Sequence, residues 1–330
     1  MKSDSQQSQR AGTPTGEVAV RPVALFVLGV PRSGTSAVTR VLSLCGARLP
    51  AGLSGADPRN PRGYWEPRAS LHLNNTILRS HGSAVFDASL RLQEEGLDGD
   101  QKAACINKIG QFLATLPSAP LVLIKDLQIT LLSSLWFEAA RMAGFDIAVV
   151  NMVRPPQEVI ASGAADFLTL PELGSALWLK FNLLAERDTR GLPRVFVEYA
   201  NLLDDWRREV KRISVALGID LDTRDEAAIE EFLTPDLHRQ RTSEPVQETF
   251  GTDWMSAVYE TLRAAALDEP WDQSALDRVY AEYRASEQGF RKVFENSFRL
   301  HKLNRFIRPS LLKLRYEVVA MAHRRRGTWA

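Results

Sequence analysis

The chain has 330 residues and a mass of 36.8 kDa, with 45% hydrophobic and 25% charged residues. This composition is typical of a folded globular protein and excludes global disorder. The 41 basic and 40 acidic side chains nearly cancel, which argues against nucleic acid as a partner. Two cysteines, Cys45 and Cys105, are too few for a disulfide framework and lack metal-ligand spacing, so we expect a reducing, cytoplasmic location and no metal.

The N-terminal residues 1–21 are polar and contain no continuous apolar segment of the kind that a secretion signal needs. We therefore expect a disordered tail there. The longest apolar runs, such as Val23–Leu28, are far shorter than the roughly 20 residues that span a bilayer. Such runs predict buried strands in a soluble protein.

Short apolar runs alternate with amphipathic segments from residue 22 to about residue 220. Strands are predicted at Val23–Leu28, Leu121–Ile124, Ile147–Val153 and Arg194–Val197. Helices are predicted directly after the first strand and at 69–80, 100–116, 130–142, from Pro155 onward, at 172–189 and at 201–217. This alternation predicts a three-layer α/β/α P-loop-like domain over residues 22–220, with a parallel central sheet. Residues 221–330 show no further strand pattern and predict a helical C-terminal extension.

The end of this extension is basic and amphipathic. Residues 301–326 carry eight Lys or Arg side chains and one acid, Glu317, interleaved with apolar side chains, and Pro309 divides the segment into two helical pieces. Two interpretations remain open: a helix packed on the domain with a solvated basic face, or a peripheral contact with a membrane surface or a partner. A homodimer is open as well.

A phosphate-loop pattern follows the first strand. Gly29-Val30-Pro31-Arg32-Ser33-Gly34-Thr35-Ser36 has the glycine spacing of a Walker A loop, but Thr35 stands where that motif has lysine. Glycines let successive N–H groups point inward, and the helix that follows adds its positive end. Because Arg32 carries the basic charge instead, we expect this loop to bind phosphate or sulfate. A standard ATPase is disfavoured.

A second anion-binding pattern follows the third strand. Arg154 comes directly after the strand, and Ser162 lies eight residues later in the next helix. Open parallel sheets bind ligands at the carboxyl ends of their strands, so both side chains are expected at the same edge as the phosphate loop. Two anion-binding strand ends in one sheet suggest a ligand with phosphates at both ends.

With these motifs the chain resembles the PAPS-dependent sulfotransferase family, and its bacterial soluble branch in particular (PAPS is 3′-phosphoadenosine 5′-phosphosulfate). Pro31–Ser36 matches the family's 5′-phosphosulfate loop, and Met152–Pro155 with Ser162 matches its 3′-phosphate motif. The resemblance covers roughly residues 22–240, with its motifs in the expected order. Further family-like strings are Asn60–Glu66, Ile124–Asp126, Val197–Leu203 and Phe232–Leu237.

The resemblance implies transfer of a sulfuryl group from PAPS to a hydroxyl or amine of an acceptor, such as a carbohydrate or another small molecule, with PAP as product and no metal. Glu66 would be the base that takes the acceptor proton, and Arg32 and Lys125 would stabilise the leaving group. The donor-binding residues would be Arg32, Ser33, Gly34, Thr35, Ser36, Arg154, Ser162 and Tyr199.

Several of these residues have a structural interpretation too. Glu66 would instead hold its loop by an ion pair with Arg62 or Arg68, and Lys125 would pair with a structural carboxylate. Other candidates are His72 and His81 as alternative bases, Tyr64 and Trp65 as walls of the acceptor or adenine site, and Trp178 and Phe181 as core residues.

Two other functions remain open at this stage. A P-loop kinase or nucleotide-binding protein would need a basic residue in place of the Walker lysine and a carboxylate for Mg²⁺, and Thr35 argues against it. A nucleotide-sensing or membrane-docking scaffold would use the basic C-terminal segment instead.

Overall fold

The computed structural model describes residues 21–167, 170–223, 225–234, 237, 245–286, 297, 299–300 and 309–325. Of the predicted N-terminal tail, only Arg21 is described, and its guanidinium donates to the carbonyl of Gly144. Residues 301–308 and 326 of the basic C-terminal segment lie outside the described residues.

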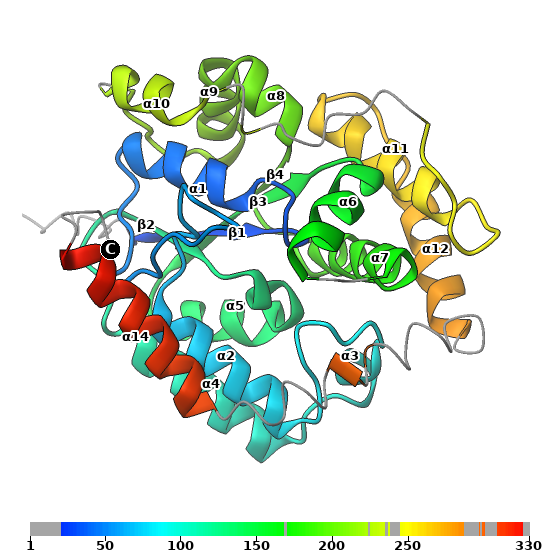
Figure 1. Cartoon of the computed structure of the whole chain (residues 1–330), viewed down its shortest axis with the longest axis horizontal. Coiled ribbons are helices and arrows are strands. Elements are labelled where there is room, and N and C mark those ends of the chain that lie inside the picture. Colours follow the sequence, from blue (N-terminus) through cyan, green and yellow to red (C-terminus); the bar gives the residue numbers. More distant parts are fainter. Residues whose placement is uncertain are drawn as a thin grey trace, which may run out of the picture.

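The core of the fold is a four-stranded parallel sheet (Figure 1). Its strands are β1 (Val23–Leu28), β2 (Leu121–Lys125), β3 (Asp146–Val153) and β4 (Arg194–Glu198), arranged in the order β2-β1-β3-β4. Phe26 of β1 lies opposite Ile124 and Val149 of the neighbouring strands. The four predicted strands and their parallel arrangement are therefore confirmed.

Helices cover both faces of this sheet, as the prediction of three layers requires. Alternate side chains of β1 point to opposite faces, so Phe26 packs with Trp136 and Leu25 packs with Val38 in two separate apolar clusters. In Figure 1 the face that Leu25 shares is covered by α1 (Thr35–Leu44), α8 (Tyr199–Asp204) and α9 (Trp206–Leu217). The face that Phe26 shares is covered by α5 (Ser133–Met142) and α7 (Pro171–Asp188).

The remaining helices of the first 200 residues are α2 (Arg68–Ser80), α3 (Arg91–Glu95), α4 (Gly99–Leu113) and α6 (Pro156–Phe167). The short helix α3 has no counterpart in the sequence prediction. Asp98 caps α4: its side chain accepts from the N–H of Gln101, whose own side chain accepts from the Asp98 N–H.

Two segments predicted as single helices are each divided into two elements, and a capping aspartate begins one element of each pair. The segment predicted at 130–142 consists of the 3₁₀ helix η1 (Leu127–Leu131) followed by α5, and the Asp126 side chain accepts from the N–H of Gln128. The segment predicted at 201–217 is divided into α8 and α9, with the Asp205 side chain accepting from the N–H of Arg208. A carboxylate that satisfies free N–H groups starts a new helix at these points.

Beyond β4 the described residues form helices and loops, as predicted for the C-terminal extension. After α8 and α9, the helices given for the described residues are α10 (Glu226–Phe232), α11 (Trp254–Ala266), α12 (Gln273–Ala285) and α14 (Pro309–Arg325). No described helix combines the length and the apolar character needed to cross a membrane.

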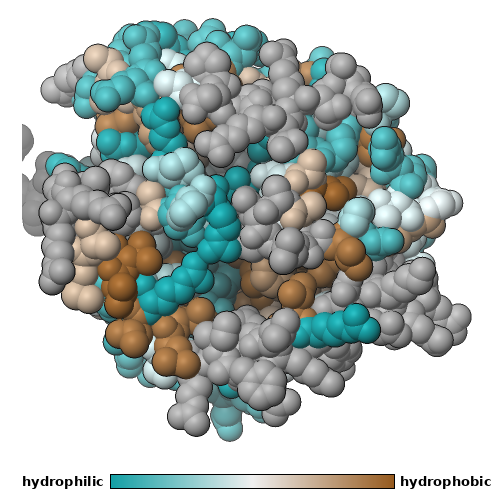
Figure 2. Space-filling view, viewed as in Figure 1, coloured by the Kyte–Doolittle hydropathy of each residue, from teal (hydrophilic) through white to brown (hydrophobic). Residues whose placement is uncertain are grey.

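The helix α14 lies across α2 (Figure 1). The Arg68 guanidinium on α2 contacts the Glu317 carboxylate at 3.3 Å, His72 Nδ1 lies 3.1 Å from the carbonyl oxygen of Pro309, and Ala320 is buried. The described part of the basic segment thus packs on the domain, and peripheral membrane contact stays a prediction. Its outer face is less polar than predicted, because Figure 2 shows apolar side chains gathered there, namely Leu311, Leu314, Val318 and Met321.

Candidate active site

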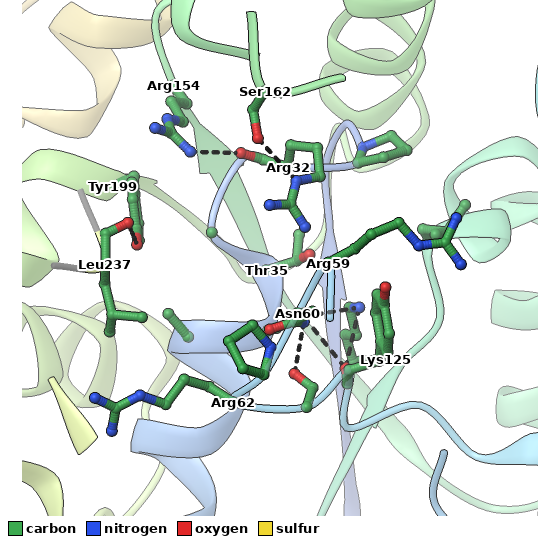
Figure 3. A pocket seen from close by; sticks show the side chains of 18 of the residues that line it. Arg32, Thr35, Arg59, Asn60, Arg62, Lys125, Arg154, Ser162, Tyr199 and Leu237 are labelled. Carbon is green, nitrogen blue, oxygen red and sulfur yellow. Dashed lines mark hydrogen bonds between the residues drawn. The ribbon is translucent and has the colours of Figure 1, made fainter. Parts of the chain in front are cut away.

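The loops that follow β1, β2 and β3 meet at one edge of the sheet around a cavity of about 250 Å³ (Figure 3). β2 and β3 lie on either side of β1, so this is the point where the chain's crossovers change direction and where open α/β sheets bind ligands. We call this the donor cavity, after the sulfuryl donor that the sequence resemblance predicts. No Asp or Glu is among the described residues that line it. Five cationic side chains line it: Arg32, Arg59, Arg62, Lys125 and Arg154.

The phosphate loop has the backbone geometry of an anion cradle. Gly34 precedes α1 with φ +94°, and a Cβ atom there would lie 2.2 Å from the ring of Tyr199, so only glycine fits. Arg32 also has a positive φ, of 74°, which is unusual for a residue other than glycine. The N–H groups of Gly34, Thr35 and Ser36 donate to no carbonyl of the described residues, which leaves them for a ligand.

Ser33 and Ser36 have different positions in this loop. The Ser33 hydroxyl is fully buried and donates to the Val30 carbonyl at 2.8 Å, so it closes the loop and is not among the lining residues. The Ser36 hydroxyl lies within 3.3 Å of the Lys125 ammonium and lines the cavity, as Thr35 does.

The predicted connection between the phosphate loop and the end of β3 is present. The Arg32 Nε atom donates to the Ser162 hydroxyl at 2.9 Å, and an Arg154 terminal nitrogen donates to the Arg32 carbonyl at 2.9 Å (Figure 3). Ser162 thus points back from α6 toward the loop. The two anion-binding motifs, separated by more than 100 residues in the sequence, form one continuous surface.

Arg154 is buried and held from several sides. Its Nε atom contacts Glu158 at 2.9 Å, and its guanidinium lies 4.8 Å from the ring centre of Tyr199. The Tyr199 hydroxyl donates to the carbonyl of Leu237, which fixes the ring as a wall of the donor cavity. The second terminal nitrogen of Arg154 donates to none of the described residues, so it remains for an anionic group of a ligand.

Lys125, at the end of β2, is held by three acceptors at the wall of the donor cavity. Its ammonium donates to the Ser36 hydroxyl at 3.3 Å, to the Tyr64 carbonyl at 3.2 Å and to Glu66 Oε1 at 2.6 Å. The Lys125 and Glu66 side chains are only 2% and 5% exposed. Lys125 therefore pairs with a carboxylate, as its structural interpretation predicted. This carboxylate belongs to Glu66, the candidate base.

Glu66 lies at the boundary between the donor cavity and a second cavity of about 340 Å³, which it lines. Its Oε1 atom accepts from Lys125 and from the N–H of Leu127, whereas Oε2 accepts from none of the described residues. The alternative ion pairs predicted for Glu66 are wrong. Arg62 bonds Thr234 and the carbonyl of Glu231, and Arg68 pairs with Glu317.

A buried polar network lies behind this ion pair. Asp126 is fully buried and accepts from the Ser70 hydroxyl, the Asn74 amide and the Gln128 N–H, each at 2.9 Å. The Asn74 amide oxygen in turn accepts from the indole of Trp136. Burial raises the pKa of Asp126 to about 7, and the charge of the neighbouring Glu66 adds to the rise.

This raised pKa predicts how Asp126→Asn changes the pH dependence of stability. In the unfolded chain Asp titrates near 3.9, so between about pH 4 and 7 the folded protein binds more protons than the unfolded chain. The wild-type free energy of unfolding should therefore fall, relative to that of Asp126→Asn, as the pH rises through this window. The slope should be at most about 1.4 kcal/mol per pH unit and should vanish above about pH 7.

Urea unfolding at pH 4.5, 6 and 7.5 measures this difference. Asp146→Asn is the control, because the Asp146 side chain is 59% exposed and its loss should leave the pH dependence nearly unchanged. Parallel curves for wild type and Asp126→Asn would show that Asp126 is already ionised at the acidic end of this window.

Three residues that line the donor cavity, Arg59, Asn60 and Arg62, were not predicted as donor-binding residues from the sequence. Asp57 folds their loop by accepting from the N–H groups of Arg59 and Asn60. The Asn60 amide then bonds Gly63 and, at 3.4 Å, the Ser36 hydroxyl, which brings the loop over the donor cavity. The sequence feature that could have pointed to them is a pair of arginines in the long loop between the phosphate-loop helix and the predicted base.

The other candidates are distributed between the site and the core. Tyr64 lines both cavities, whereas Trp65 is buried and packs against the Arg40 guanidinium. His72 lies under α14 and His81 lies beside the Cys105 thiol, and neither is among the residues that line the two cavities. The prediction that Trp178 and Phe181 are core residues is confirmed, since both are fully buried.

Comparisons with known proteins give remote structural matches. No protein-family model and no curated protein matches the sequence. Among solved structures, the chain is similar to the sulfotransferase domain from the curacin biosynthetic pathway, at 15% identity and a TM-score of 0.44, over 76% of this chain and 99% of that domain. It is similar to the sulfotransferase domain from the Synechococcus PCC 7002 olefin synthase, at 19% identity and a TM-score of 0.41, over 84% and 98%. At these values we base the functional inference on the site itself.

Proposed function

We propose that the protein is a sulfotransferase that transfers a sulfuryl group from PAPS to a hydroxyl of a small acceptor. The observation that carries this proposal is the donor cavity, where Arg32, Lys125 and Arg154 from three adjacent strand ends meet Arg59 and Arg62 from a loop, without a lining carboxylate. Such a cavity is complementary to a ligand with several negative charges. The free N–H groups of the phosphate loop and the free nitrogen of Arg154 suit anionic groups at two ends of one molecule.

The donor supplies the sulfuryl group, and the residues around the cavities supply the rest. The acceptor oxygen forms a bond to sulfur, the bond from sulfur to the bridging 5′-phosphate oxygen breaks, and its electron pair remains on that oxygen of PAP. Glu66 takes the acceptor proton on its free Oε2 atom. Lys125 and Arg32 stabilise the charge that develops on the leaving oxygen.

A P-loop kinase fits the site less well. In such enzymes Mg²⁺ is held by an acidic side chain beside the phosphates, whereas no Asp or Glu is among the described residues lining the donor cavity. The proposed transfer should therefore continue in EDTA. An absolute requirement for Mg²⁺ would favour the kinase instead.

The most direct test of the proposed function is a transfer assay with ³⁵S-labelled PAPS against a panel of hydroxyl and amine acceptors. Transfer of label in the presence of EDTA, together with PAP binding measured by calorimetry, is the expected result. Binding of ATP·Mg²⁺ but not of PAP would contradict the proposal.

Arg154→Ala should weaken PAP binding by roughly 10- to 150-fold, because a charge-assisted hydrogen bond contributes about 1.5–3 kcal/mol. Ser162→Ala should act in the same direction but less, since a neutral donor contributes about 1 kcal/mol. Calorimetric titration with PAP measures both effects.

The control for Arg154→Ala addresses its buried partner. Removal of Arg154 also leaves Glu158 without this ion pair, so Arg154→Ala/Glu158→Gln separates a loss of PAP affinity from a loss of stability. Equal PAP affinity in wild type and in the double variant would show that Arg154 does not bind the donor.

A further inference from the structure

The second cavity adjoins the donor cavity on the far side of the ion pair between Lys125 and Glu66. The two cavities share the lining residues Pro31, Arg59, Tyr64 and Leu127. Lys125 lines the donor cavity, whereas Glu66 lines the second one. A molecule in the second cavity would therefore meet the carboxylate of Glu66 next to the place where the phosphate loop holds its anion.

The walls of the second cavity are largely apolar, in contrast to the cationic donor cavity. The apolar side chains come from α2, from the loop after α2 and from the C-terminal part of the chain: Leu71, Val85, Phe86, Leu300, Leu312 and Val319. Polar lining residues besides Glu66 and Gln128 include Ser54, Asp57, Arg59, Asn75 and Arg315, which contribute the smaller part of the surface. The volume of about 340 Å³ is within the range of pockets that hold small organic molecules. Burial of an apolar body there would be favourable, whereas several hydroxyls of a sugar would lose their hydrogen bonds to water.

Two hydrogen-bond acceptors lie among these apolar walls without a donor. Glu66 Oε2 accepts from none of the described residues, and the Gln128 amide oxygen is buried and likewise without a partner among them. A buried acceptor that lacks a hydrogen bond is costly and points to a ligand that supplies one. Both residues line the second cavity, but the Gln128 oxygen itself is enclosed, so Glu66 Oε2 is the acceptor that suits the hydroxyl of a ligand with an apolar body.

Helix α14 forms the outer wall of this cavity. Arg68 and His72 of α2 hold it in place, and Tyr316 of α14 is also a lining residue. Burial raises the pKa of Tyr316 to about 12, and the charges of Glu66 and Asp126 add to the rise, so this ring lies close to the candidate base. The wall and the base thus belong to one site, although they are distant in the sequence.

We infer that the second cavity is the acceptor site and that the acceptor is an alcohol with an apolar body, seated against Leu312 and Val319 with its hydroxyl at Glu66. The assignment of this cavity to the acceptor rests on the proposed sulfuryl transfer. The apolar binding site itself does not depend on the reaction and is tested separately.

Calorimetric titration with hexan-1-ol, octan-1-ol and decan-1-ol, in the presence of PAP, tests the binding site. If the chain is buried, affinity should rise about fourfold per methylene, which corresponds to about 0.8 kcal/mol, until the cavity is filled. Glucose, which has many hydroxyls and no apolar body, should not bind measurably. An affinity that is independent of chain length would overturn the inference.

Two matched pairs of variants locate the binding site on α14. Val319→Trp and Leu312→Trp should fill the cavity and lower octan-1-ol affinity at least tenfold. The adjacent changes Val318→Trp and Leu311→Trp are the controls, because these side chains are 51% and 52% exposed and do not line the cavity. All four variants should bind PAP as the wild type does. Equal octan-1-ol affinity in a cavity variant and in its control would overturn the inference. Because two positions are tested, the result does not depend on the correct folding of a single variant.

Transfer from labelled PAPS to the same alcohols separates this inference from the proposed function. Label in the octan-1-ol product, lost in Val319→Trp and retained in Val318→Trp, supports both. Chain-length-dependent binding without any transfer would overturn the proposed reaction and with it the role as acceptor, but not the apolar site. Transfer to glucose in preference to the alcohols would overturn the inference and leave the sulfotransferase intact.

Discussion

Glu66→Gln should lower kcat by about 10²–10⁴-fold while PAP still binds. The amide keeps the size of the carboxylate and accepts the hydrogen bond from Lys125, but it cannot take up the acceptor proton. The free Oε2 atom of Glu66 at the boundary of the two cavities is where this proton would go. Steady-state kinetics at saturating PAPS, together with PAP titration, measures the two effects.

The control for this prediction has to account for the ion pair, since Glu66→Gln also leaves the buried Lys125 ammonium without a counter-charge. Assays are therefore run below the melting temperature of the variant. Chemical rescue is the more specific readout: formate should partly restore the activity of Glu66→Ala, which a merely structural role would not explain. A kcat within about threefold of the wild type would exclude Glu66 as the base.

Lys125→Met should lower the free energy of unfolding by about 3–5 kcal/mol, because it leaves the Glu66 carboxylate buried without its partner. The double variant Lys125→Met/Glu66→Gln should recover most of this loss, since neither charge remains. Urea unfolding measures the stability of all three proteins. Both variants should be poor enzymes, as the cation beside the leaving oxygen is absent from each.

The exposed ion pair between Lys102 and Glu138 is the matched control for this cycle. Its atoms lie 2.7 Å apart, about as close as those of Lys125 and Glu66, but the side chains are 45% and 43% exposed. Lys102→Met should therefore cost less than about 1 kcal/mol. Similar losses of unfolding free energy in Lys125→Met and Lys102→Met would mean that water reaches Lys125 and that the ion pair with Glu66 is not buried.

Local patterns were sufficient to predict the scaffold of the site. The strand Val23–Leu28 is a continuous apolar run closed by Gly29, and the spacing from Gly29 to Ser36 fixes a loop and the start of a helix. Arg154 follows its strand directly, so the parallel sheet alone brings it to the same edge. In each case the residues that determine the structure are neighbours in the sequence.

What the sequence did not predict depends on contacts between distant segments. Lys125 and Glu66 are 59 residues apart, and nothing near either of them shows that they would neutralise each other. The wall formed by Leu312 and Val319 depends on how α14 crosses α2, which apolar periodicity does not determine. Likewise, the break at Asp205 comes from a single side-chain hydrogen bond that a hydrophobic pattern does not contain.

The position of α14 has a consequence for the order in which the molecule is assembled. The bond between Arg68 and Glu317 joins residues 249 positions apart, so α2 leaves the ribosome long before its partner helix. At about 5–20 residues per second, this interval is on the order of 10 to 50 s. A nascent chain would complete its anion cradle first and enclose the apolar cavity last. Until then the surface of α2 that α14 covers is open to water, which makes it a candidate surface for chaperone binding during synthesis.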